Sequence, residues 1–110
     1  MSPLHEVNLQ LFTRYLRILK RIEPNTSPDD PTSIQYLLSM CETAIRHPEM
    51  YIDKHSRWLG YIQGVLTMRG HINVQEERDF SRPLYQDAYR RMGLEQPKTL
   101  EVFSEIYPAM

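Results

Sequence analysis

Residues 53–70 constrain the fold most, because their pattern is typical of a helix that packs on more than one side. On a helix, the large apolar residues of this segment cover about half of the circumference or more. They are Trp58, Leu59, Tyr61, Ile62, Val65, Leu66 and Met68. The remaining face is small and polar, with Gly60 and Gly64 four residues apart. Each glycine lowers helix stability by about 0.8–1 kcal/mol relative to alanine. We therefore expect a close helix crossing there, within or between protomers, or a bound ligand.

Other segments repeat apolar residues at three- and four-residue steps, which predicts further helices. The stripe of the first, over residues 4–22, consists of Leu4, Val7, Leu11, Tyr15, Ile18 and Ile22, widened by Phe12, Leu16 and Leu19. A second helix is expected from Pro31, capped by Asp30, to His47. A third is expected from the Asn73 cap to residue 92, either kinked at Pro83 or restarting there.

A short helix is also predicted over residues 100–107, whereas strand-like alternation is nearly lacking. The fold class expected is therefore all-α, a compact bundle of four or five helices forming a single domain over residues 1–110. The short turn of residues 70–72 predicts that the helix over 53–70 and the one after it pack as a central antiparallel pair. Gly70 is well placed as a left-handed C-terminal cap.

Composition excludes several function classes. The formal net charge of −1 argues against general nucleic-acid binding, and no segment is apolar for long enough to span a membrane. The single cysteine, Cys41, falls in an apolar stripe and is expected to be a buried hydrophobe in a reducing compartment. With no signal-peptide pattern, the expected location is the cytoplasm. The four histidines lack metal-ligand spacing, so no metal or other cofactor is expected.

Arginines provide the candidate binding residues. Arg14, Arg17 and Arg21 form a ridge along the first helix, and Arg57, Arg69, Arg78 and Arg82 lie on or beside the two central helices. Guanidinium groups suit carboxylates and phosphates alike. A solvated face or pairing with nearby Asp and Glu is the plainer interpretation of both sets. Gly60, Tyr61, Gln63 and Gly64 complete the candidate binding set.

Part of this pattern resembles small uncharacterised proteins of tailed bacteriophages. The resemblance rests on Ser56-Arg57-Trp58-Leu59-Gly60, Ile62-Gln63-Gly64-Val65-Leu66, Glu77-Arg78-Asp79 and Ser81-Arg82-Pro83. It extends to residues 26–33 and covers about two thirds of the chain. It implies a phage accessory protein made in the bacterial cytoplasm, but it implies no activity and no catalytic residues.

The leading hypothesis is therefore a non-enzymatic protein that binds and inhibits a bacterial host protein of a defence or regulatory system. The alternative is a protein that sequesters a host signalling nucleotide, with Arg57, Arg69 or Arg82 on phosphate and Tyr61 or Tyr85 stacked on the base. A hydrolase using Glu76, Glu77 and Asp79 ranks last. The surplus apolar residues of the first helix predict a homo-oligomer, most simply a dimer.

Overall fold

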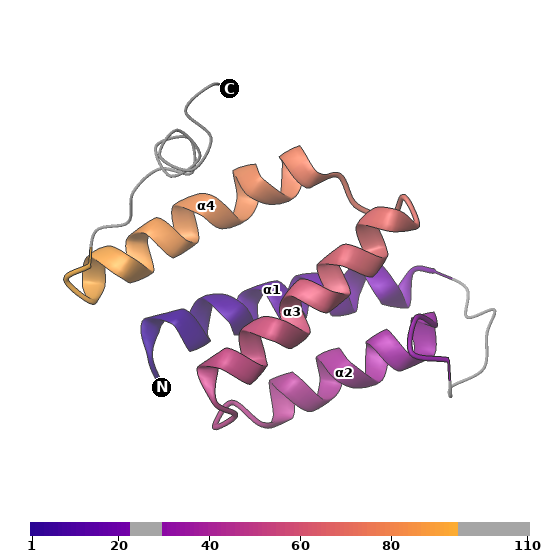
Figure 1. Cartoon of the computed structure of the whole chain (residues 1–110), viewed down its shortest axis with the longest axis horizontal. Coiled ribbons are helices and arrows are strands. Elements are labelled where there is room, and N and C mark those ends of the chain that lie inside the picture. Colours follow the sequence, from indigo (N-terminus) through magenta and orange to yellow (C-terminus); the bar gives the residue numbers. More distant parts are fainter. Residues whose placement is uncertain (23–29, 95–110) are drawn as a thin grey trace, which may run out of the picture.

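The computed structural model describes residues 1–22 and 30–94. This part of the chain contains α1 (Pro3–Lys20), α2 (Ile34–Arg46), α3 (Ile52–Met68) and α4 (Val74–Arg91), without strands, which confirms the all-α prediction (Figure 1). Cys41 lies in the core as expected, and burial raises the pKa of its thiol to about 12. The helix predicted over residues 100–107 lies outside the described residues.

The helix at the centre of the bundle is α1. It contacts each of the other three helices, whereas α3 and α4 barely touch one another. Figure 1 shows α2 and α4 running antiparallel to α1 along its two sides, while α3 crosses it obliquely. The prediction that residues 53–70 form the central helix and pair with the next one is therefore wrong. The turn after α3 is short, but α4 then packs against α1 and not against α3.

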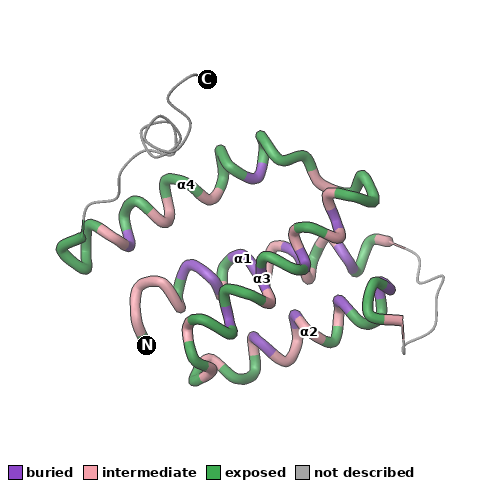
Figure 2. Tube along the Cα trace, viewed as in Figure 1, coloured by how far each residue is buried: buried purple, intermediate pink, exposed green. Residues whose placement is uncertain are grey.

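The core explains why α1 takes this position. Its residues Phe12 and Leu19, which widen the apolar stripe, are completely buried against neighbouring helices of the same protomer. Figure 2 shows the buried positions concentrated on α1 and on the sides of α2 and α3 that face it. The apolar surplus that predicted a dimer is thus used within the protomer, so it no longer argues for a second copy.

The helix ends are capped by residues that lie within one turn of them. Asn73 Oδ1 accepts from the backbone N–H of Glu76 at 3.1 Å, and Gly70 adopts a φ of 76°, as the sequence predicts. The predicted Asp30 cap is wrong. The Asp30 carboxylate accepts instead from the backbone N–H and the hydroxyl of Thr32. The cap of α2 is Ser33, whose hydroxyl accepts from the backbone N–H of Tyr36 at 3.0 Å.

Pro83 lies inside α4, which continues through it as one helix from Val74 to Arg91. Restarting at residue 82 is therefore ruled out. The Pro83 ring is exposed, where the lost backbone hydrogen bond disturbs no buried contact.

Candidate functional site

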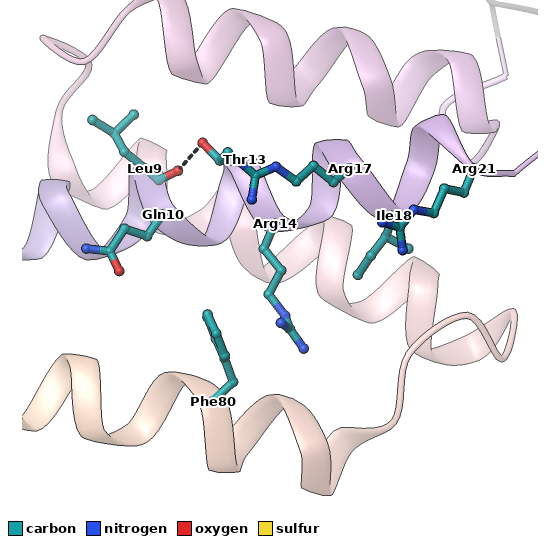
Figure 3. A pocket seen from close by; sticks show the side chains of 8 residues that line it. All are labelled: Leu9, Gln10, Thr13, Arg14, Arg17, Ile18, Arg21 and Phe80. Carbon is teal, nitrogen blue, oxygen red and sulfur yellow. Dashed lines mark hydrogen bonds between the residues drawn. The ribbon is translucent and has the colours of Figure 1, made fainter.

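A groove of about 750 Å³ lies along the exposed side of α1, next to α4. It is lined by Leu9, Gln10, Thr13, Arg14, Arg17 and Ile18 of α1, by Arg21 directly after α1, and by Phe80 of α4. Figure 3 shows Arg14 and Phe80 extending towards one another across the gap between the two helices. The arginine ridge predicted from the sequence therefore lies in a concave site, together with apolar side chains.

Arg14 forms an ion pair that joins α1 to α4. Its Nε and Nη2 atoms donate to the two carboxylate oxygens of Glu77 at 3.1 and 3.0 Å. The same guanidinium lies 4.0 Å from the centre of the Phe80 ring, within the range of a cation–π contact. Glu77 also accepts from the Tyr15 hydroxyl at 2.7 Å, and Gln63 of α3 donates to that hydroxyl at 3.0 Å.

These hydrogen bonds determine the protonation of Glu77. Burial alone would raise the pKa of its carboxyl. The hydrogen bonds from Arg14 and Tyr15 together outweigh burial and leave the pKa below its ordinary value. Burial, followed by the hydrogen bond to Glu77, raises the pKa of Tyr15 well above its ordinary value. Glu77 is therefore an anion and Tyr15 a neutral donor near pH 7. This network neutralises Arg14.

Within the described part of the chain, Arg17 and Arg21 differ from Arg14 in having no acidic partner. Both side chains are exposed, and no carboxylate within residues 1–22 and 30–94 forms an ion pair with either of them. They lie four residues apart and thus on the same face of α1. Phe80 is 40% exposed beside this face. The groove is accordingly lined by two arginines that have no acidic partner in the described residues, and by an accessible aromatic ring.

A second polar network lies farther towards the N-terminus of α1. Asn8 is buried; its amide donates to Ser56 Oγ of α3 at 3.1 Å, and its carbonyl accepts from the hydroxyl of Tyr85 of α4. Burial raises the pKa of Tyr85 to about 12. The hydroxyl of Tyr85, one of the two tyrosines considered for base stacking, therefore holds α4 against α1.

The glycine face of α3 is open to solvent. An added Cβ at Gly60 or at Gly64 would meet no atom within 4 Å in the described part of the chain. The two glycines point away from α1, since the opposite side of α3 carries the buried residues Leu59, Ile62 and Leu66. A close crossing at these glycines within the protomer is therefore wrong. Approach by another molecule stays a prediction.

Other candidate residues of α3 serve local contacts. The Tyr61 hydroxyl donates to the Pro31 carbonyl at 2.7 Å, and Arg69 Nη2 donates to Thr32 Oγ1 at 2.9 Å. These two bonds hold the turn before α2 against α3. Arg57 forms an exposed ion pair with Asp53 at 3.7 Å. The structure thus places Tyr61 and Arg69 on the same turn, where both already bind its residues, and Arg57 apart from them on Asp53.

The remaining candidates lie on α3 and α4. Arg78 and Gln63 line a smaller hollow of about 200 Å³, whereas Arg82 is exposed and lines neither site. The three carboxylates considered for hydrolysis also diverge. Glu77 points to Arg14 and Tyr15, Asp79 accepts from Gln75 at 3.0 Å, and Glu76 is exposed.

His55 is a feature that the sequence did not reveal. Its side chain is completely buried, and neither ring nitrogen has a hydrogen-bond partner in the described part of the chain. It packs against the rings of Phe12 and His5, at centroid distances of 4.7 and 5.5 Å. Burial, together with the charge of His5, lowers the pKa of His55, and the nearby backbone of Ala44 opposes this only in part. Neutral His55 is therefore the form compatible with the fold.

Comparison of the chain with protein-family models, with curated proteins and with solved structures gives no match. Within residues 1–22 and 30–94, no three His, Cys, Asp or Glu side chains gather closely enough to hold a metal ion. None of the helices described there has the length and apolar character needed to cross a membrane.

Proposed function

We propose that this chain is a non-enzymatic accessory protein of a bacteriophage that binds a bacterial host protein through the α1–α4 groove and inhibits it. The observation that supports this best is the combination of Arg17 and Arg21, without acidic partners in the described residues, with the exposed Phe80. Arginine and aromatic side chains are enriched among residues that dominate protein–protein binding energy. The phage context comes from the resemblance of the sequence, and with it comes the bacterial cytoplasm as the place of action.

The nucleotide alternative receives less support from the geometry. It needs arginine and aromatic groups that converge on one concave site. Of the aromatic residues considered for it, Tyr85 binds Asn8, and Tyr61 holds the Pro31 carbonyl. Arg14, the arginine in contact with the Phe80 ring, is already paired with Glu77.

Capture from bacterial lysate tests the proposal when paired with groove variants. The immobilised full chain is compared with the double variant Arg17→Glu/Arg21→Glu. The matched control is Arg46→Glu/Lys54→Glu, which changes the net charge equally at exposed positions outside the groove. We expect a bacterial protein, identified by mass spectrometry, that the wild type and the control retain and the groove variant loses. The activity of that protein should fall when the purified wild-type chain is added.

Two results would contradict the proposal. One is a captured protein that the groove variant retains as well as the control does. The other is calorimetric binding of a mono-, di- or cyclic nucleotide tighter than about 10 μM that disappears in Arg57→Ala, because this would establish the nucleotide alternative.

A further inference from the structure

We propose that the groove accepts an acidic amphipathic helix of the partner protein, lying along α1. This inference rests on the proposed function and specifies the chemistry of the partner. Carboxylates of the helix bind Arg17 and Arg21, while its apolar side chains cover Leu9, Ile18 and Phe80.

The shape of the groove favours an elongated ligand. Its lining on this side extends from Leu9 of α1 to Arg21 at the end of that helix, twelve residue steps that correspond to about 18 Å along the axis. A partner helix of about twelve residues has the same length. The neighbouring helix α4 contributes Phe80 as a side wall. A helix bound there would add a further antiparallel or parallel neighbour to α1 along its exposed side.

The distance between Arg17 and Arg21 along α1 matches the repeat of side chains on a partner helix. Arg17 and Arg21 are one turn apart, which is about 6 Å along α1. Carboxylates at positions i and i+4 of a second helix repeat at the same distance. Arginine forks bind carboxylates with two parallel hydrogen bonds. Since Glu77 already neutralises Arg14, the groove has two charges to offer, and they lie in a row instead of converging on one point.

The apolar residues that line the groove fit the apolar face of an amphipathic helix. Phe80 is 40% exposed, and Leu9 and Ile18 are partly buried. Helices that bind in grooves place apolar anchors at i, i+3, i+4 and i+7, next to a polar face. An acidic amphipathic helix therefore satisfies the cations and covers the exposed ring at the same time. A chain of phosphates would satisfy only the cations.

Designed peptides test this chemistry before the partner itself is identified. The probe is a fluorescent peptide of about fifteen residues, with leucine and phenylalanine anchors at helical spacing and glutamates one turn apart beside them. One comparison peptide carries glutamine in place of each glutamate, and another carries a central proline. Each is titrated with the full chain, and binding is followed by fluorescence anisotropy and by peptide helicity.

We expect saturable binding and helix formation only for the acidic peptide. The glutamine and proline peptides should each bind at least about tenfold more weakly, which is about 1.4 kcal/mol. Arg17→Glu/Arg21→Glu should abolish binding and Phe80→Ala should weaken it. Arg46→Glu/Lys54→Glu should leave it unchanged, as a control for overall charge.

Equal binding of the acidic and glutamine peptides, equal binding of the proline peptide, or no binding of any peptide would overturn this inference. A groove-dependent host protein from the lysate experiment would still uphold the proposed function in those cases. Loss of a dimer on Arg17→Glu/Arg21→Glu, measured by light scattering, would identify the occupant as a second copy of this chain. That result would overturn the inference as well.

Discussion

The two helices that flank α1 are attached to it by opposite means. From α2, four residues on one face are buried against the common core: Ile34, Leu37, Cys41 and Ala44. From α4, only Ala88 and Glu77 are buried, and Glu77 is held by Arg14 and Tyr15. Apolar burial is non-directional and strong per area, whereas hydrogen bonds fix position but add modest net stability. The polar attachment fixes the place of α4 while leaving the side of α1 beside it uncovered, and this uncovered side is the groove.

The largest effect is expected from the apolar attachment. Leu37 is completely buried, so Leu37→Ala should lower the free energy of unfolding by about 2–5 kcal/mol through lost burial and a residual cavity. Urea denaturation measures this effect. Gln35→Ala, on the exposed side of α2, is the control and should change stability by less than about 0.5 kcal/mol. A loss below about 1 kcal/mol at Leu37 would mean that α2 is not held by its apolar face.

A smaller and more local effect is expected from the polar attachment. Glu77→Ala leaves Arg14 and the Tyr15 hydroxyl without their acceptor and should cost about 1–3 kcal/mol, reduced by the partial exposure of Arg14. Native-state hydrogen exchange should show faster exchange in α4 and little change in α2. Glu76→Ala, at the exposed neighbour, is the control. Equal acceleration in both helices would show that α4 does not open separately.

The local rules of helix formation could be read from the sequence. The spacing of apolar residues predicts the four described helices. Gly70 marks the end of α3 and Asn73 the start of α4, because capping depends on residues within one turn. Asp30 was misleading because its carboxylate could also close a local turn with Thr32, which left capping to Ser33. Which helix lies at the centre could not be read in the same way, since Phe12 and Leu19 serve equally well for a protomer core or a dimer.

The candidate site was predictable only in part. The ridge of Arg14, Arg17 and Arg21 follows from helical spacing, and all three side chains line the groove. Nothing local distinguishes Arg14, which pairs with Glu77 63 positions away, from Arg17 and Arg21, which have no acidic partner in the described residues. Phe80 was missed for the same reason: its place beside α1 is set by how α4 returns along the bundle.

Titration with acid tests buried His55 of α3 and the polar attachment of α4 at different pH values. Because the pKa of buried His55 lies below its ordinary value of 6.5, the unfolded chain binds more protons as the pH falls through 6.5. Stability should therefore fall as the pH falls from neutral through 6.5 towards about pH 5. The contribution of Glu77 is complete above its ordinary pKa of 4.5 and is lost as the pH falls through its lower folded value.

Denaturation at a series of pH values measures both steps. His55→Leu should flatten the step near pH 6 and keep the more acidic one. An unchanged step near pH 6 in this variant would show that another group carries it.

The smallest effect is expected on the face of α3 that belongs to neither attachment. Gly64→Ala should stabilise the protein by about 0.5–1 kcal/mol, because alanine favours the helix and its Cβ meets nothing within 4 Å. Gly70→Ala is the contrasting control and should destabilise, since Gly70 has a φ of 76°. Thermal unfolding measures both. Destabilisation by Gly64→Ala would reveal a close contact, such as a second copy, on this face.

Hydrogen exchange with and without the acidic helical peptide tests the central claim most directly, namely that binding bridges α1 and α4 at the groove. A ligand held by Arg17, Arg21 and Phe80 contacts both helices, so it stabilises the closed arrangement by mass action. We predict that a saturating peptide slows exchange in α4 and leaves exchange in α2 unchanged, and that Arg17→Glu/Arg21→Glu removes the effect. Unchanged exchange in α4 at saturation, or equal slowing in α2, would contradict the account.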